Sequence, residues 1–142
     1  MASPLFPRSP RETMCGWMYL PRYIDKIRLH LAGRLDEGYR NNFGKGFDAM
    51  WLQAAGLTHE AFIEVVRNTL TDGEVADWVR LHVIRDEDAK RQHAAAMLAM
   101  PAADDEARLA RFATLKQAAG LAHRDDIRSF VDLIDADERR MN

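Results

Sequence analysis

The chain has 142 residues, of which 47% are hydrophobic and 30% charged, and it contains one cysteine. This composition is typical of one globular domain and excludes disordered, collagen-like and coiled-coil classes. No apolar run approaches the ~20 residues that cross a bilayer. The first eleven residues hold three prolines and lack the apolar core of a secretory signal. We therefore expect a cytoplasmic protein with no membrane attachment and no internal disulfide.

The net charge of −2 is distributed unevenly along the chain. Residues 1–45 hold eight basic and four acidic residues, whereas residues 46–142 hold twelve basic and eighteen acidic ones. The first segment therefore carries +4 and the second −6. A pI near 6.2 argues against a general nucleic-acid binder. Because of its local excess of basic residues, we expect the functional surface to lie in the first third of the chain.

Helical periodicity dominates the chain, and we find no alternation typical of a strand. Pro21 and Gly33 mark the ends of an amphipathic helix over residues 21–32. Thr58 caps a later helix, and Thr71 opens another in a capping box with Glu74. Glycine and asparagine predict a loop over residues 34–46. The remaining predicted helices cover residues 47–55, 86–100 and 103–119, and the last begins at Asp125 or Asp126.

Several motifs resemble those of one family of small bacterial proteins, the domain of unknown function numbered five thousand and sixty-nine. They are Arg8-Ser9-Pro10-Arg11, Pro21-Arg22 with Ile24-Asp25-Lys26 and Arg28, Leu31-Ala32-Gly33, Phe47-Asp48, and the stretch from Asp72 to Trp78. The resemblance is best over residues 8–83. It implies a small cytosolic helical domain, and it carries over no catalytic residue.

The expected fold is all-α, a compact single domain of six or seven short helices with an extended N-terminal arm. Residues 1–142 form this one helical domain, in which residues 8–83 are the family-like core and residues 84–142 are a helical extension. A seam is expected near residues 84–86, where more weakly apolar helices begin.

The polar face of the first helix is the first candidate site. On a helical wheel Arg22, Asp25 and Lys26 lie opposite the apolar stripe, with Leu29 beside them. One interpretation is a basic recognition face for a carboxylate, a phosphate or an acidic partner. The alternative is that Arg22 and Asp25 form an internal salt-bridge network beneath the loop that follows.

The loop before the second helix is the next candidate. Lys45 stands between two glycines just ahead of a helix, where backbone N–H groups favour anions. The spacing does not match a P-loop, so the alternative is a plain flexible turn. Tyr39 and Arg40 would join an anion site in this loop.

Metal and nucleophile signals are weak. His93 shares a helical face with Met97 and Met100, an arrangement more often used in packing than in binding a soft metal. Cys15 is the one possible nucleophile, and a lone cysteine in an arm is more often incidental. We expect no metal and no cofactor.

The leading functional hypothesis is a non-enzymatic binding or interaction module, with a basic N-terminal face for an anionic small molecule or an acidic protein partner. The alternative is a small enzyme that acts on an anionic substrate with Asp25 or Asp48 as general base. The candidate ligand-binding residues are Arg22, Asp25, Lys26, Arg28, Tyr39, Arg40, Lys45 and Asp48.

Overall fold

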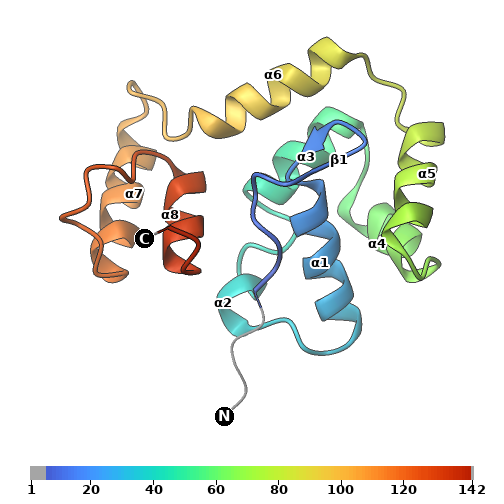
Figure 1. Cartoon of the computed structure of the whole chain (residues 1–142), viewed down its shortest axis with the longest axis horizontal. Coiled ribbons are helices and arrows are strands. Elements are labelled where there is room, and N and C mark those ends of the chain that lie inside the picture. The colour runs from blue at the N-terminus through green and yellow to red at the C-terminus, as the bar shows by residue number, and fades with distance from the viewer. Residues whose placement is uncertain (1–5, 142) are drawn as a thin grey trace. The chain divides into compact units, whose positions relative to one another are not determined.

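The structure is a computed structural model that describes residues 6–141. Contacts divide the chain into two units, Met1–Ala94 and Ala95–Asn142. The described part contains eight helices and one two-stranded hairpin (Figure 1). The all-α prediction is therefore confirmed, with eight helices in place of six or seven. The added helix is α2 (Glu37–Arg40), a single turn inside the predicted loop.

The N-terminal arm contains a hairpin that the sequence did not predict. Strand β1 (Thr13–Met14) pairs antiparallel with β2 (Trp17–Met18). Cys15 and Gly16, with φ of 43° and 83°, form the turn between them. A two-residue turn with two positive φ values matches the right-handed twist of a hairpin. Strands of two residues are too short to show alternation, which explains why the arm was expected to be extended throughout.

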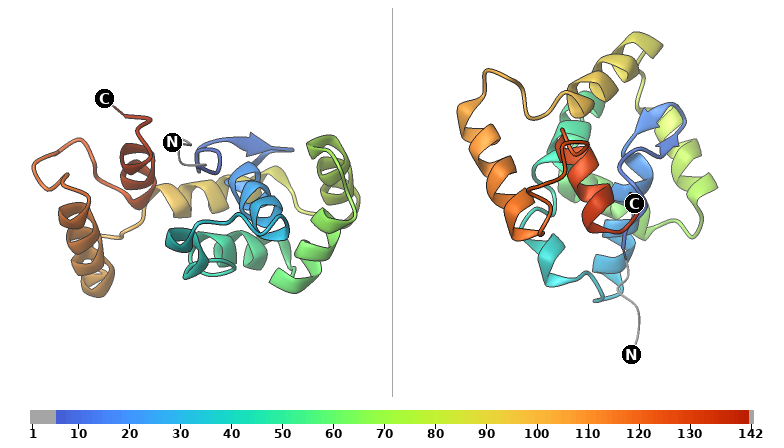
Figure 2. Two further views of the ribbon diagram at one scale, coloured as in Figure 1. Left: turned by 90° about the horizontal axis from the view of Figure 1, so that it is seen from below. Right: turned by 60° about the vertical axis from the view of Figure 1, so that its left-hand side comes forward.

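Helix α1 (Leu20–Leu31) begins and ends where its sequence signals predict. Pro21 lies in the first turn, and Gly33 follows the C-terminal end with a φ of 68°. The hairpin lies over the start of α1 (Figure 2), and the opposite side of the helix packs against α4 (His59–Arg67). Tyr23 and Ile24, both 0% exposed, belong to the buried face.

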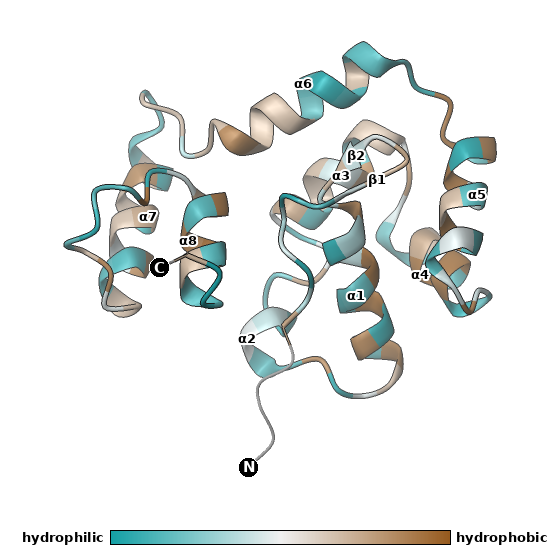
Figure 3. Cartoon of the chain, in the orientation of Figure 1, coloured by the Kyte–Doolittle hydropathy of each residue, from teal (hydrophilic) through white to brown (hydrophobic). Residues whose placement is uncertain are grey.

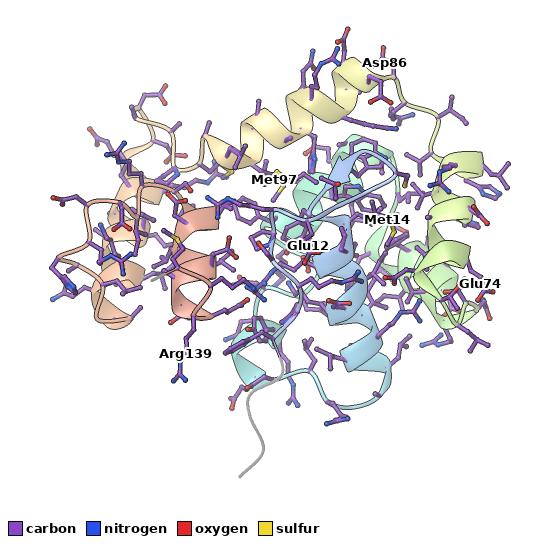
Figure 4. The ribbon with its side chains drawn as sticks, viewed as in Figure 1. Glu12, Met14, Glu74, Asp86, Met97 and Arg139 are labelled. Atoms are coloured by element: carbon purple, nitrogen blue, oxygen red, sulfur yellow. The ribbon has the colours of Figure 1, made fainter. Side chains whose placement is uncertain are left out.

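Capping residues define the next helices as predicted. Helix α3 (Phe47–Ala55) ends at Gly56, and the Thr58 hydroxyl accepts a hydrogen bond from the Ala61 N–H at the start of α4. Helix α5 (Asp72–His82) begins with a complete capping box, in which Glu74 lies in the first turn (Figure 4). The short link between α4 and α5 brings these two helices into contact.

Four aromatic residues form the centre of the first unit. Trp17, Tyr23, Trp51 and Phe62 come from β2, α1, α3 and α4, and each is at most 1% exposed. Their ring centroids lie 4.8–6.1 Å apart in edge-on, tilted or stacked pairs. Such pairs add about 0.5–1.5 kcal/mol each beyond the burial of their area. The aromatic cluster thus joins elements that are far apart in the sequence.

Helix α6 (Glu87–Leu98) continues across the boundary between the two units. Its first half is hydrophilic and its end is hydrophobic (Figure 3). The second unit contains α7 (Glu106–Ala118) and α8 (Phe130–Asp137), and Phe112 packs edge-on against Phe130 at 5.4 Å. No helix in residues 6–141 is both long enough and apolar enough to span a membrane.

The predicted start of the last helix at Asp125 or Asp126 is wrong. The Ser129 hydroxyl accepts a hydrogen bond from the Asp132 N–H and caps α8 at residue 130. Asp126 is instead held by the Arg124 guanidinium at 2.6 and 2.7 Å. Aspartate and serine are both favoured helix caps, so the sequence alone does not show which of these residues begins the helix.

Thr71→Ala tests the capping box. Loss of the hydroxyl leaves the Glu74 N–H without its acceptor, so we expect the free energy of unfolding to fall by about 1 kcal/mol. Urea denaturation measures this change. Gln53→Ala, at an exposed position of α3, is the control and should change stability by less than about 0.5 kcal/mol. Equal effects of the two variants would contradict the role of the box.

Candidate functional site

A buried carboxylate joins α1, α3 and the loop between them. Asp48, in the first turn of α3, is 0% exposed. The Lys26 ammonium donates to its two oxygens at 3.0 and 2.9 Å, and the Tyr19 hydroxyl donates to Oδ1 at 2.5 Å. The Gly44 N–H donates to Oδ2 at 2.8 Å. We call these four residues the Asp48 cluster.

The Asp48 cluster occupies the helix start at which the sequence suggested an anion. Gly44 has a φ of 77°, and a Cβ at this position would lie 2.7 Å from the His59 ring, so a glycine is required. The N–H of Gly44 is bound by the protein's own carboxylate. Lys45 remains exposed beside it and stays a predicted ligand contact.

The sequence left two interpretations of the polar face of α1, an open recognition face or an internal network, and the burial of Arg22 and Lys26 favours the network. Each residue is 4% exposed. The Arg22 guanidinium donates to the carbonyl oxygen of Arg8 at 3.1 Å and lies 5.6 Å from the centre of the Tyr39 ring. The N-terminal arm therefore supplies the acceptor for Arg22, and the Tyr39 ring of α2 lies beside the guanidinium. The alternative of an internal network agrees with this burial.

Asp25 is also bound within the protein. It accepts hydrogen bonds from the Arg8 N–H at 2.8 Å and from the Arg8 guanidinium at 2.9 Å on each oxygen. Arg8 also pairs with Asp72 of α5 at 2.9 Å. The hydrogen bond with Asp25 raises the pKa of Arg8 above its ordinary value. Arg8 thus ties the arm to both α1 and α5.

The remaining sequence candidates lie nearer the surface. Arg40 and Lys45 are exposed, and Arg28 and Tyr39 are half-buried. Arg40 donates to the carbonyl oxygen of Leu35 at 2.9 Å. The predicted residues therefore do not converge on one open site, since Arg22, Lys26 and Asp48 lie in the interior. A ligand-binding role for Arg40 and Lys45 stays a prediction.

A cleft of about 160 Å³ lies elsewhere in the first unit. Its walls come from the hairpin, α5, the segment after α5 and the start of α6, and we call it the cationic cleft. Its lining residues are Cys15, Trp17, Val79, Arg80, Val83, Ile84, Arg85 and Lys90. Three of these side chains are cationic and none in this described lining is acidic. Sequence reasoning missed the three because acidic residues, Asp77 and the run Asp86-Glu87-Asp88, lie beside them in the chain and hide the local excess of positive charge.

Hydrogen bonds hold two of the cations in place. Lys90 donates to the carbonyl oxygen of Cys15 at 3.0 Å, and its Cδ would lie 3.0 Å from a Cβ at Gly16. Arg85 donates to the carbonyl oxygens of Ala54 and Ile84 at 3.0 and 2.8 Å. Within residues 6–141 Arg85 has no carboxylate partner. Carbonyl groups therefore hold the Arg85 guanidinium in place, and no carboxylate of the described residues compensates its positive charge.

A family model described as Domain of unknown function (DUF5069) matches residues 5–140. The chain belongs to this family. The match includes the segment after residue 83 that the sequence analysis treated as an extension, so both units are part of the family domain. No curated protein matches the chain.

Cys15 of this DUF5069 chain lines the cleft with a protonated thiol. Burial raises the pKa of the thiol, and this effect exceeds the opposite influence of Arg80 and Lys90. A thiol in this state is a poor nucleophile at neutral pH. Elsewhere, the described residues contain no group of three His, Cys, Asp or Glu side chains placed to hold a metal ion.

His93 is a buried imidazole on α6. It is 6% exposed and packs edge-on against Trp17, with ring centroids 5.6 Å apart. Neither ring nitrogen has a hydrogen-bond partner among the described protein atoms. Burial lowers the pKa of His93, because a charged ring there would lose its hydration without gaining an acceptor.

Asp48→Asn tests the Asp48 cluster. The change leaves the buried Lys26 without this carboxylate, so the free energy of unfolding should fall by about 3 kcal/mol or more. Asp36→Asn, at an exposed position, is the control and should be nearly neutral. In the double variant with Lys26→Met the loss should be smaller than the sum of the single losses, as denaturant unfolding would show. Additive losses would contradict the pairing.

His93 should also make stability dependent on pH. Its pKa is lower in the folded than in the unfolded chain, so the unfolded chain binds more protons below about pH 6.5. Stability should then fall as the pH decreases from about 7 to 5. His93→Leu should reduce this slope, and His82→Gln, at an exposed position, should leave it unchanged. Burial lowers the pKa of His59 as well, so part of the slope should remain. Identical slopes for all three proteins would refute this role of His93.

Proposed function

We propose that this DUF5069 chain is a non-enzymatic binding module for a small anionic ligand, which it takes up in the cationic cleft. One observation carries the proposal: Arg80, Arg85 and Lys90 line a single concave site whose described lining includes no acidic side chain. Convergent cations in a cleft raise the local concentration of anions and orient them. The ligand class agrees with the sequence prediction, whereas the proposed site differs.

The internal pairs of these cations do not prevent ligand binding. Arg80 pairs with Asp77 and Lys90 with Glu87, at 3.1 and 3.3 Å. The two carboxylates are 76% and 73% exposed, and such surface pairs are worth only about 0.2–1 kcal/mol. An anion in the cleft can therefore compete for both cations. The hydrogen bonds of Arg85 to carbonyl oxygens leave its charge available to the ligand.

The chemistry of the lining supports binding rather than catalysis. General base catalysis needs a group with a pKa near the working pH, within reach of the substrate. The two candidate bases, Asp25 and Asp48, are not part of the lining. Asp48 is also 0% exposed, and Asp25 is held by Arg8. The lining does contain the Cys15 thiol, but burial raises its pKa further from neutrality, so it is a poor base and a poor nucleophile.

Titration with inorganic phosphate, followed by amide NMR, tests the site. We expect saturable shifts at the hairpin and the start of α6. Lys90→Met and Arg80→Met should each weaken binding by about tenfold, the effect of losing one charged hydrogen bond. Arg91→Met is the matched control, because Arg91 pairs with Asp88 on α6 and does not line the cleft.

The same titration separates the cleft from the surface predicted by sequence. Shifts centred on residues 39–46, together with a loss of binding in Arg40→Met and Lys45→Met, would show that the anion binds at that loop. This result would overturn the proposal that it binds in the cationic cleft. Absence of saturable binding anywhere would overturn the proposed function itself. Thermal unfolding of each variant checks that a loss of binding is not a loss of folding.

A further inference from the structure

Half of the cationic cleft is apolar. Trp17, Val79, Val83 and Ile84 line it together with the three cations and Cys15. Trp17, Val79 and Val83 are at most 5% exposed, whereas Ile84 is open to solvent. An inorganic anion would satisfy the cations and leave the Ile84 side chain in contact with water. A ligand that also has an apolar body would remove this surface from water, at about 25 cal/mol per Å².

One apolar residue of the lining is unusually open. Ile84 is 72% exposed, although a Val or Ile side chain gains about 1.5–3 kcal/mol when it is fully buried. It lies next to Arg85 in the segment between α5 and α6. A bound molecule that contacts both side chains would cover apolar surface and meet positive charge at adjacent positions.

The volume of the cleft limits the size of the ligand. At about 160 Å³ it is close to the ~150 Å³ of an apolar protein cavity that holds one benzene molecule. Sites for drug-sized ligands and cofactors are about 300–1,000 Å³. The cleft therefore admits a body of about one six-membered ring or a short branched chain, and it is too small to enclose a nucleotide.

Arg80 is the cation best suited to bind the anionic group. It donates to Asp77 through Nη1, and its other guanidinium N–H groups have no acceptor within residues 6–141. Two adjacent N–H groups of a guanidinium match the two oxygens of a carboxylate. Arg85, by contrast, directs its N–H groups to backbone carbonyls.

We infer that the ligand of the cationic cleft is a small organic carboxylate whose apolar body is about the size of a benzene ring. The inference rests on the proposed function and specifies its ligand class. The carboxylate meets Arg80 and Lys90, and the apolar body lies against Ile84.

Comparison of benzoate with acetate and benzyl alcohol tests the inference by amide NMR titration of the full chain. We expect benzoate to bind at least about tenfold more tightly than acetate, because its ring is buried. It should also bind more tightly than benzyl alcohol, which lacks the charge. Arg80→Met should weaken the binding of benzoate and of phosphate alike.

Ile84→Ser isolates the apolar contribution. This variant should weaken the binding of benzoate by about threefold or more and leave the binding of phosphate unchanged, because only the ring contacts this side chain. Leu81→Ser is the matched control, because Leu81 is 73% exposed, close to the 72% of Ile84, and does not line the cleft. Equal effects of the two variants on benzoate would overturn the placement of the ring.

The outcomes separate the inference from the proposed function. Equal affinities for benzoate and acetate, with binding still dependent on Arg80, would overturn the ligand class and leave the anion site in place. Benzyl alcohol binding as tightly as benzoate would overturn the role of the carboxylate. If neither benzoate nor phosphate binds, both the inference and the proposed function are refuted.

Discussion

The ion pair between Lys26 and Asp48 is the contact on which the first unit depends. A fully buried carboxylate is tolerated only when its charge is paired and its oxygens are hydrogen-bonded, and here three residues supply the donors. Tyr19 is one of them. It precedes α1 with a φ of 79°, a conformation that a non-glycine residue keeps only when its surroundings hold it there. Tyr19 lies between the hairpin and α1, so its hydrogen bond to Asp48 joins the buried pair to the end of the hairpin. The hairpin in turn forms one wall of the cationic cleft.

The uneven charge of the chain acquires a different meaning in the folded protein. Part of the N-terminal excess is engaged within the protein, because the buried Arg22 and Lys26 and the half-buried Arg8 hold the arm and α3 against α1. The cleft, in contrast, takes its cations from the segment after residue 46, whose net charge is −6. The net charge of a segment does not show which of its side chains lie on the same surface of the folded protein. Acidic residues that point to solvent, such as Asp77 and Glu87, lower the net charge without lining the cleft.

Features that arise within a few residues could be predicted. Thr58 and Thr71 cap their helices because each hydroxyl accepts a hydrogen bond from the N–H group three residues later, and such contacts need no other part of the chain. The hairpin and α2 escaped prediction because elements of two to four residues carry no periodic signal. The apolar stripe of α1 could also be predicted from the sequence. Whether its polar face is a recognition surface or an internal network stayed open, because a helical wheel cannot show that another segment packs on it.

The sequence by itself determined the helical class, most helix boundaries and the family, since these follow from local hydrogen bonding, apolar periodicity and motifs of fixed spacing. Only the tertiary structure decided which charges are buried and which share a surface. Lys26 and Asp48 are twenty-two residues apart, and Cys15 and Lys90 are seventy-five apart. Whether two such groups meet depends on packing summed over the whole core, because no local rule relates positions at that separation.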